Sequence, residues 1–400
     1  MAENKIRVVF VNLHGNEFLV KTLNKIIFKQ SVAVKHRYLL DYLLDRDDIE
    51  VCTYINERGL SLSYTTRNRQ LQSFRFMEHR IAMKKNGIPL SKVTVLKSET
   101  DLRPTDIIVV YAYYGQTQLY WKNIPDATRV ICQIHFGTKN ADLERRFAPH
   151  VMYNESNLQK YSGMWRRDLP WFSGKFLTMP FVYEPRFQPK KPFAERKCKA
   201  VSVGTITYMA NIADYYGDSC AQPARRNCRL LAKECPNVMD SFNSDYLEDQ
   251  QDVKRKPTSN PVIEVWRRLH DKFTVGHQKQ YYSFNMVDKF NDYRIAVVGE
   301  EIMGIPGIGF VEAMACGCAY IGQTTGYYEE YGMREGEHYI GYDGTKEGLR
   351  ATIEYWQRPE NQQELERIAA NGCRFVRENF CGPKVAERLV GSLVALSKQK

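Results

Sequence analysis

The first half of the chain alternates short apolar runs with longer segments whose apolar positions recur at helical spacing. Residues 31–44 show this spacing clearly, with Val34, Tyr38 and Tyr42 on one face of the expected helix. Apolar runs of strand length, separated by such segments, predict parallel strands that are connected by helices. Six runs fit this description: residues 5–12, 50–55, 92–96, 106–112, 129–134 and 175–180. The pattern predicts an α/β domain with a doubly wound sheet.

The second half repeats the alternation after a segment in which Pro185, Pro189 and Pro192 enclose two lysines. That composition is typical of an interdomain linker. Strands are expected over residues 199–205, 293–298 and 319–321, and helices over residues 261–270, 283–290 and 310–316. The polar residues 240–260 predict a surface insertion. We therefore expect an N-terminal domain over residues 1–183, a linker over 184–197, a C-terminal domain over 198–380 and a C-terminal helix over 381–400.

Composition and charge narrow the class of protein. A chain of 400 residues is long enough for two hydrophobic cores. Its formal net charge of +11 favours an anionic partner, such as a nucleotide sugar, a phospholipid surface or nucleic acid. The ten cysteines show no zinc-binding spacing, and no run reaches the ~20 apolar residues that a membrane span needs. We expect a cytoplasmic protein, with peripheral contact to the inner membrane face as an open alternative.

The stretch from Gly304 to Cys318 carries the strongest chemical signal. It joins two expected strands through a glycine-broken loop and a short helix of small residues. Gly307 and Gly309 allow a ligand to approach the backbone closely, because glycine has no Cβ. The first amides of the helix are unpaired donors that favour an anion, and Glu312 stands in the first turn. This arrangement predicts a phosphate-binding loop with a carboxylate that accepts ribose hydroxyls. The alternative is a buried turn between strand and helix, with Glu312 as a surface residue that complements the helix dipole.

The end of the stretch, Glu312-Ala-Met-Ala-Cys-Gly317, resembles the donor-binding element of the retaining GT-B glycosyltransferases of family 4, or group 1. The family pattern is E-x7-E, ending in E-A-M-A-x-G, and the turn at residues 322–329 is similar to the family's as well. The resemblance implies a GT-B-like α/β fold: two doubly wound, Rossmann-like domains that face a central cleft. It also implies that the last helix packs back onto the N-terminal domain.

One position departs from the family pattern. The first glutamate of E-x7-E would fall at position 304, which is glycine here, while Glu300 and Glu301 stand shortly before it. The role of the second glutamate carries over to Glu312. Glu301 is the candidate for the missing catalytic carboxylate, and Glu300 is the alternative.

The resemblance also assigns a donor-binding set. Its members are the two residues at the end of the first strand of the C-terminal domain and the residues of the loop and helix: Gly204, Thr205, Gly307, Ile308, Gly309, Phe310 and Glu312. The family places an arginine after the first glycine and a lysine a few residues later, and both hold the diphosphate. This chain has Thr205 instead and no nearby lysine, so the diphosphate-binding cation is left open among Arg225, Arg226, Arg229 and Lys279.

The N-terminal domain supplies the other candidate residues. His135 directly follows the expected strand at 129–134, and ligands of doubly wound sheets bind at the carboxyl ends of the strands. Members of the resembling family commonly place a histidine here, beside the donor sugar, so His135 is a catalytic candidate. In the same family the first loop of the domain faces the acceptor, which makes Gly15, Lys35 and His36 acceptor-side candidates. The alternative is that Lys35 and His36 are exposed helix residues.

The reaction that the resemblance implies is transfer of a sugar from a nucleotide diphosphate sugar with retention of configuration, to a glycan, lipid-linked or other acceptor. It requires no cofactor and no metal, because amides and a cation stabilise the leaving diphosphate.

Asp45-Arg-Asp47 matches a metal motif of another glycosyltransferase fold, but its place between a helix and a strand favours a solvated turn. Residues 164–172, where aromatic side chains alternate with arginine, indicate a packed loop or, alternatively, a membrane-interface segment.

Three other hypotheses about the function stay open. A NAD-dependent Rossmann enzyme fits poorly, because Glu312 occupies the third glycine position of G-x-G-x-x-G. A catalytically degenerate relative would account for the departures at positions 205 and 304. A transferase that modifies DNA or another macromolecule would account for the positive charge, and its binding would depend steeply on salt.

Overall fold

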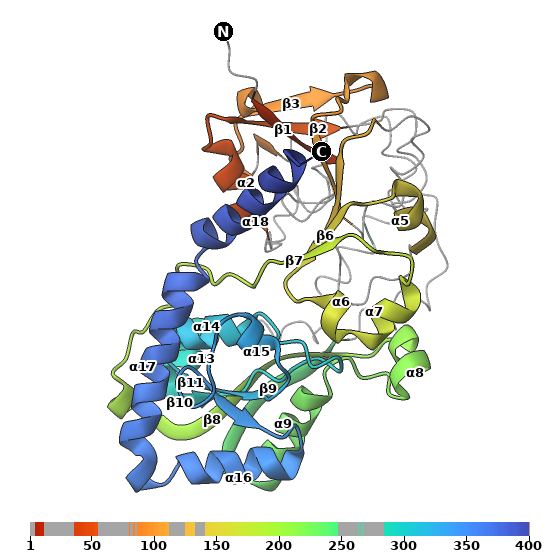
Figure 1. The fold of residues 1–400 in the computed structure, drawn as a ribbon. Coiled ribbons are helices and arrows are strands. Elements are labelled where there is room, and N and C mark those ends of the chain that lie inside the picture. The colour runs from red at the N-terminus through yellow and green to blue at the C-terminus, as the bar shows by residue number, and fades with distance from the viewer. Residues whose placement is uncertain are drawn as a thin grey trace. The chain divides into compact units, whose positions relative to one another are not determined.

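A computed structural model describes residues 5–11, 36–54, 80, 83–84, 86–111, 125–132, 141–246, 263, 266 and 284–399. The chain divides into two compact units. Unit 1 consists of Met1–Met179, Pro257–Pro261 and Val385–Lys400, and unit 2 consists of Pro180–Lys256 and Val262–Lys384. Each unit is built on its own parallel sheet (Figure 1). Among the described residues, no helix combines the length and the apolar character that crossing a bilayer requires.

Unit 1 contains a seven-stranded sheet in the order β3-β2-β1-β4-β5-β6-β7. The neighbouring strands pair in parallel throughout. Its strands are β1 (Ile6–Val11), β2 (Ile49–Tyr54), β3 (Val93–Leu96), β4 (Ile107–Tyr111), β5 (Thr128–Cys132), β6 (Val151–Asn154) and β7 (Lys175–Thr178). All but β6 coincide with the six apolar runs named above. The inner strands are apolar because a parallel strand that is covered on both faces buries nearly all its side chains.

The described helices of unit 1 include α2 (Arg37–Leu44), α5 (Ala141–Phe147), α6 (Leu158–Tyr161), α7 (Gly163–Asp168) and most of α18 (Gly382–Ser397), with short 3-10 turns at Leu90–Lys92 and Glu99–Asp101. Helix α18 packs against the sheet beside α2 (Figure 1). Leu393 of α18 and Leu43 of α2 line the same small apolar cavity as Phe10 of β1. The C-terminal helix therefore completes the core of unit 1.

Unit 2 contains a five-stranded parallel sheet in the order β12-β11-β10-β8-β9. Its strands are β8 (Lys197–Thr207), β9 (Met239–Tyr246), β10 (Tyr293–Ala296), β11 (Ala319–Gln323) and β12 (Ile340–Tyr342). Strand β9 lies where the sequence predicted the start of a surface insertion, and that part of the prediction is wrong. The strand is polar because it forms the edge of the sheet, where side chains stay partly exposed.

Helices cover both faces of the sheet of unit 2 (Figure 1). Ala296 and Val298 belong to one buried cluster, whereas Ile295 and Val297 belong to the other, as the alternation of side chains along a strand requires. The described helices of this unit include α8 (Ala210–Tyr216), α9 (Pro223–Glu234), α13 (Met286–Asp292), α14 (Gly309–Ala315), α15 (Tyr327–Glu330), α16 (Lys346–Trp356) and α17 (Gln362–Asn379), with 3-10 turns at Phe193–Glu195 and Pro359–Asn361.

Two minor sequence signals are resolved in unit 1. Trp165 is buried, and its ring meets those of Phe172 and Phe176 edge to face at 5.8 and 5.6 Å, so this part of residues 164–172 is packed. The expected loop is wrong for the first part of the segment, which belongs to α7. Asp45 ends α2, and its side chain is 79% exposed. The Asp45-Arg-Asp47 sequence therefore forms a solvated turn, as expected.

Candidate functional site

The loop that follows β10 is held in shape by its own backbone. The amide of Glu301 donates to the carbonyl oxygen of Ile305 at 2.9 Å, and the amide of Gly304 donates to that of Glu301 at 2.7 Å. Gly304 has a φ of +75°, which side chains with a Cβ rarely adopt. Helix α14 begins directly afterwards, at Gly309, and its seven residues are all buried. The loop thus leads the chain from the carboxyl end of β10 into α14 through a fixed turn.

Arg225 of α9 reaches into this loop. Its Nε donates to the carbonyl oxygen of Val298 at 3.0 Å, and its Nη1 donates to that of Thr205 at 2.8 Å. A Cβ at Gly204 would lie 3.0 Å from Nε, and one at Gly307 would lie 2.5 Å from Nη2. The guanidinium therefore fills the space that these two glycines leave, and it joins the end of β8 to the loop after β10.

The charge of Arg225 has no counter-ion within the described part of the chain. The residue is only 9% exposed, and no described carboxylate pairs with it. Its Nη2 has no hydrogen-bond acceptor among the described residues. Burying a charge without a partner costs several kcal/mol, and an anionic ligand would offset that cost. Among the cations that the sequence left open, Arg225 is therefore the candidate for anion binding, and this role stays a prediction.

The other cations that the sequence left open are placed differently. Arg226 pairs with Asp218 at 2.7 Å, and Arg229 pairs with Asp245 at 2.9 Å. Lys279 lies outside the described residues. The sequence alone could not separate these candidates, because the three arginines follow one another closely on one helix and only the fold shows which of them points into the loop.

Glu312 is buried in the first turn of α14, with 7% of its surface exposed. The pKa of its carboxyl is raised to about 7, mainly by burial and also by the Glu184 carboxylate, while the Arg186 guanidinium opposes the rise. Glu184 and Arg186 pair with each other at 2.8 Å. The carboxyl of Glu312 has no hydrogen-bond donor among the described residues. An acceptor that is buried without a donor fits a ligand hydroxyl.

Glu300 and Glu301 differ sharply in surroundings. Glu300 is fully buried, and its Oε1 accepts from the hydroxyl of Tyr328 at 2.5 Å and from the amide of Gln323 at 2.8 Å. Burial raises the pKa of the Glu300 carboxyl, and these bonds oppose the rise. This carboxylate therefore connects β10 to the end of β11 and faces away from solvent. Glu301 is half-buried in the loop, and its catalytic role stays a prediction.

Position 304 cannot accommodate the glutamate of the family pattern without strain. Gly304 has a φ of +75°, which disfavours residues with a side chain. In addition, a Cβ at this position would lie 3.1 Å from Cγ2 of Thr325. Thr325 belongs to the turn after β11 that the sequence comparison also singled out. The loop of this chain is thus built around a glycine at this position.

The candidates of the N-terminal domain are only partly described. His135, Gly15 and Lys35 lie outside the described residues. His36 precedes α2 and is 3% exposed, and its Nε2 lies 3.0 Å from Oε1 of Glu155. The alternative of an exposed helix residue is therefore wrong for His36, since it packs inside unit 1. Its acceptor-side role stays a prediction.

Comparison with known proteins identifies the fold. No family model matches the chain, and neither does any curated protein sequence. Among solved structures, HepE of Anabaena in complex with UDP and glucose has a TM-score of 0.53 and 13% identity, over 98% of this chain and 100% of that chain. The sucrose-phosphate synthase of Thermosynechococcus elongatus has a TM-score of 0.52 and 12% identity, over 99% of this chain and 100% of that chain. A glycosyltransferase from Rickettsia africae has a TM-score of 0.53 and 11% identity, over 99% of this chain and 100% of that chain.

These similarities show that the chain has a GT-B-like fold of mixed α/β type, which confirms the fold class predicted from the sequence. At identities of 11–13% they concern the fold alone.

Proposed function

We propose that this protein is a glycosyltransferase that moves a sugar from a nucleoside diphosphate sugar to a glycan, a lipid-linked saccharide or another acceptor. The observation that carries the proposal is the buried guanidinium of Arg225, which lies between Gly204 and Gly307 without a described carboxylate partner. The structural neighbour HepE was solved with UDP and glucose, and this makes UDP-glucose the first donor to test.

Arg225 would stabilise the leaving group. Breaking the bond between sugar and phosphate places negative charge on the diphosphate, and donors that are already in position stabilise that charge most effectively. Two backbone carbonyls fix the guanidinium, so it is oriented before the ligand binds. The amides near Gly307 would add neutral donors. In this proposal transfer proceeds without a metal, and full activity in excess EDTA is the expected result.

Glu312 would hold the ribose. Its carboxyl is buried without a described donor, so a hydroxyl from the ligand would satisfy it. Retention of configuration is proposed on the resemblance of Glu312-Ala-Met-Ala-Cys-Gly317 to the retaining family. His135 would act at the sugar, and Glu301 would supply the first carboxylate of the motif, which position 304 lacks.

UDP binding to matched variants tests the proposal. We expect UDP to raise the melting temperature of the wild-type protein, since a ligand at 100 times its Kd stabilises a fold by about 2.7 kcal/mol. Arg225→Gln keeps part of the hydrogen bonding but removes the charge, and it should weaken UDP binding by at least about tenfold. Arg229→Gln is the matched control, because Arg229 lies on the same helix and pairs with Asp245. Equal UDP affinity in Arg225→Gln and wild type would refute the role of Arg225.

A second candidate function rests on Gly304. Because this position carries no glutamate and its backbone conformation disfavours one, a relative that binds nucleotide sugars without transferring them also fits. Turnover separates the two. Hydrolysis or transfer with a panel of nucleotide sugars supports the transferase, whereas tight donor binding without release of nucleotide supports the non-catalytic relative.

A further inference from the structure

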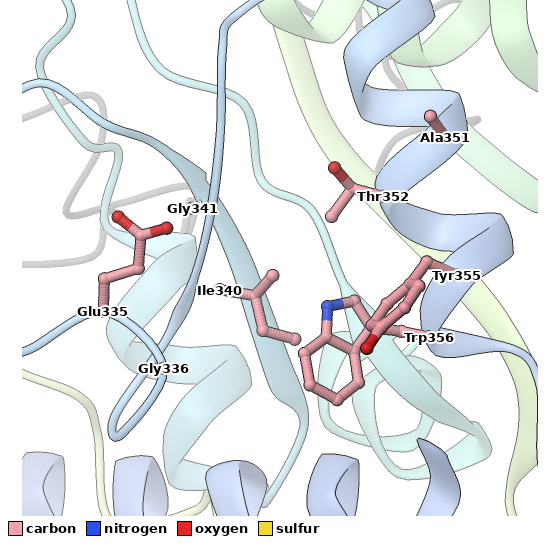
Figure 2. Close-up of a pocket in the computed structure, with 8 residues that line it drawn as sticks. All are labelled: Glu335, Gly336, Ile340, Gly341, Ala351, Thr352, Tyr355 and Trp356. Carbon is pink, nitrogen blue, oxygen red and sulfur yellow. The ribbon is translucent and has the colours of Figure 1, made fainter. Parts of the chain in front are cut away.

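A pocket of about 420 Å³ lies beside β12 in unit 2 (Figure 2). Among the described strands, β12 is at the edge of the five-stranded sheet and pairs with β11 alone. Helix α16 forms the facing wall, and the turn at Glu335 and Gly336 closes one end. The volume falls near the lower end of the range of about 300–1,000 Å³ that small-molecule sites occupy.

This pocket is separate from the site at Arg225. It is lined by the turn before β12 and by the C-terminal half of α16, which lie toward the amino end of the strand. Gly204 and Gly307, in contrast, stand at or beyond the carboxyl ends of β8 and β10. A ligand in the pocket would therefore leave the nucleotide site open.

One side of the pocket is aromatic and apolar. The ring of Tyr355 is 47% exposed, and Trp356 beside it is half-buried. The two rings meet edge to face, with centroids 5.3 Å apart. Figure 2 shows the Trp356 ring next to the side chain of Ile340. Exposed aromatic rings of this kind offer a flat apolar face to a ligand.

The pocket also contains polar groups. Thr352 lies one helical turn before Trp356 and thus on the same face of α16. Neither its hydroxyl nor the indole N–H of Trp356 has a hydrogen-bond partner among the described residues. The Glu335 carboxylate accepts only a long bond of 3.5 Å, from the hydroxyl of Thr324. The pocket therefore offers hydrogen-bond donors and acceptors to a ligand beside its apolar surface.

The charges around the pocket nearly balance. Its described lining contains one carboxylate, Glu335, and no basic side chain. The Arg358 guanidinium lies over the Tyr355 ring, 5.5 Å from its centroid, and Arg367 donates to the carbonyl oxygen of Gly336 while it pairs with Glu364 at 2.6 Å. One carboxylate and one neighbouring cation thus leave the pocket close to electroneutral, which suits a ligand without net charge.

From these features we propose that the pocket is a second, non-catalytic binding site for a neutral saccharide. A sugar ring fits both the apolar and the polar groups of the pocket. The C–H face of the sugar would pack on Tyr355 and Trp356, and the sugar hydroxyls would donate to Glu335 and form a hydrogen bond with Thr352. Such a site would hold a glycan acceptor on the protein between transfer events. The link to transfer rests on the proposed function, whereas saccharide binding itself does not.

Saccharide binding to the full chain tests the proposal. The probes are neutral mono- and disaccharides of glucose, galactose and N-acetylglucosamine at millimolar concentration, followed by saturation-transfer NMR. Tyr355→Ala removes an exposed ring, and Thr352→Val keeps the shape of the side chain but removes its hydroxyl. Tyr215→Ala is the matched control, because Tyr215 is a 38% exposed tyrosine on α8, outside the pocket.

We expect at least one sugar to bind the wild type and the control, and to bind both pocket variants at least about tenfold more weakly. Absence of binding by every probe, or equal binding by the variants, would overturn the proposal. Preference for an unstructured peptide over every sugar would do the same, since it would point to strand addition at β12. UDP binding is measured on the same samples: its loss alone would refute the nucleotide site and leave the saccharide site standing.

Discussion

Arg225 and Gly307 compete for the same space, since a Cβ at position 307 would lie 2.5 Å from Nη2 of the arginine. A separation below 3.0 Å forces one of the two groups to move. The glycine is therefore required by the position of the guanidinium, and the guanidinium is held there by the carbonyl oxygens of Val298 and Thr205. Arg225 thus connects β8, α9 and the loop after β10, and these three segments form the proposed anion site.

The first prediction follows from this contact. Gly307→Ala should displace the guanidinium and lower UDP affinity by about tenfold, which corresponds to about 1.4 kcal/mol. The fold should persist, because the flexible end of the arginine can move. Gly391→Ala is the control: a Cβ there meets nothing within 4 Å, so UDP binding should be unchanged. Calorimetric titration measures both, and unaltered affinity in Gly307→Ala would contradict the assignment.

The second prediction concerns pH and donor binding. Burial raises the pKa of Glu312 to about 7, so this carboxyl gains its charge as the pH rises from about 6 to about 8. The charged form accepts ribose hydroxyls more strongly, and UDP affinity should increase over that range. Glu312→Gln should bind UDP more weakly and without this pH dependence. The affinity is measured by titration with UDP at several pH values and at one salt concentration. A wild-type affinity that does not change from pH 6 to 8 would argue against ribose binding by Glu312.

The same pKa predicts the sign of a stability effect. Since the pKa of folded Glu312, about 7, lies above its ordinary value of 4.5, the folded protein binds more protons than the unfolded chain between these pH values. The free energy of unfolding should fall as the pH rises from 4.5 to 7, by on the order of 3 kcal/mol. Glu312→Gln should lose this slope, which denaturant titrations of both proteins at several pH values would show.

A third prediction separates a structural carboxylate from a catalytic one. Tyr328→Phe removes the hydroxyl that donates to the buried Glu300, and it should lower the free energy of unfolding by about 1.5–3 kcal/mol. UDP affinity should stay within about twofold, because Glu300 faces the core of unit 2. Denaturant unfolding and UDP titration on one preparation test both parts. A large loss of affinity with unchanged stability would place Glu300 in the donor site instead.

The fourth prediction concerns His135, whose role rests on its position after an expected strand. His135→Ala should lower kcat far more than it lowers UDP affinity, because the nucleotide is proposed to bind to unit 2. Melting temperature and kcat are measured on the same variant. Normal turnover per folded molecule, combined with a lower melting temperature, would show that His135 is structural.

The order of strands and helices could largely be predicted from the sequence. Parallel strands covered on both faces are continuous apolar runs, so β1, β2, β4, β10 and β11 are visible as patterns. Strand β9 was missed because an edge strand needs no apolar run, and its pairing with β8 depends on a neighbour far away in the chain. The GT-B class itself came from a local motif, Glu312 to Gly317, whose close packing fixes its residue types.

Only the tertiary structure decided which charged side chains are paired, which are buried and which point toward the loop after β10. Arg225, Arg226 and Arg229 are equivalent in the sequence, yet only Arg225 turns from α9 toward Gly307, while the other two pair with aspartates. Glu300 and Glu301 are neighbours, yet one is buried under Tyr328 and the other lies in the loop. The pocket between β12 and α16 has no sequence signature. Local patterns report burial and backbone conformation, whereas the partner of a charge is set by segments that meet only when the chain folds.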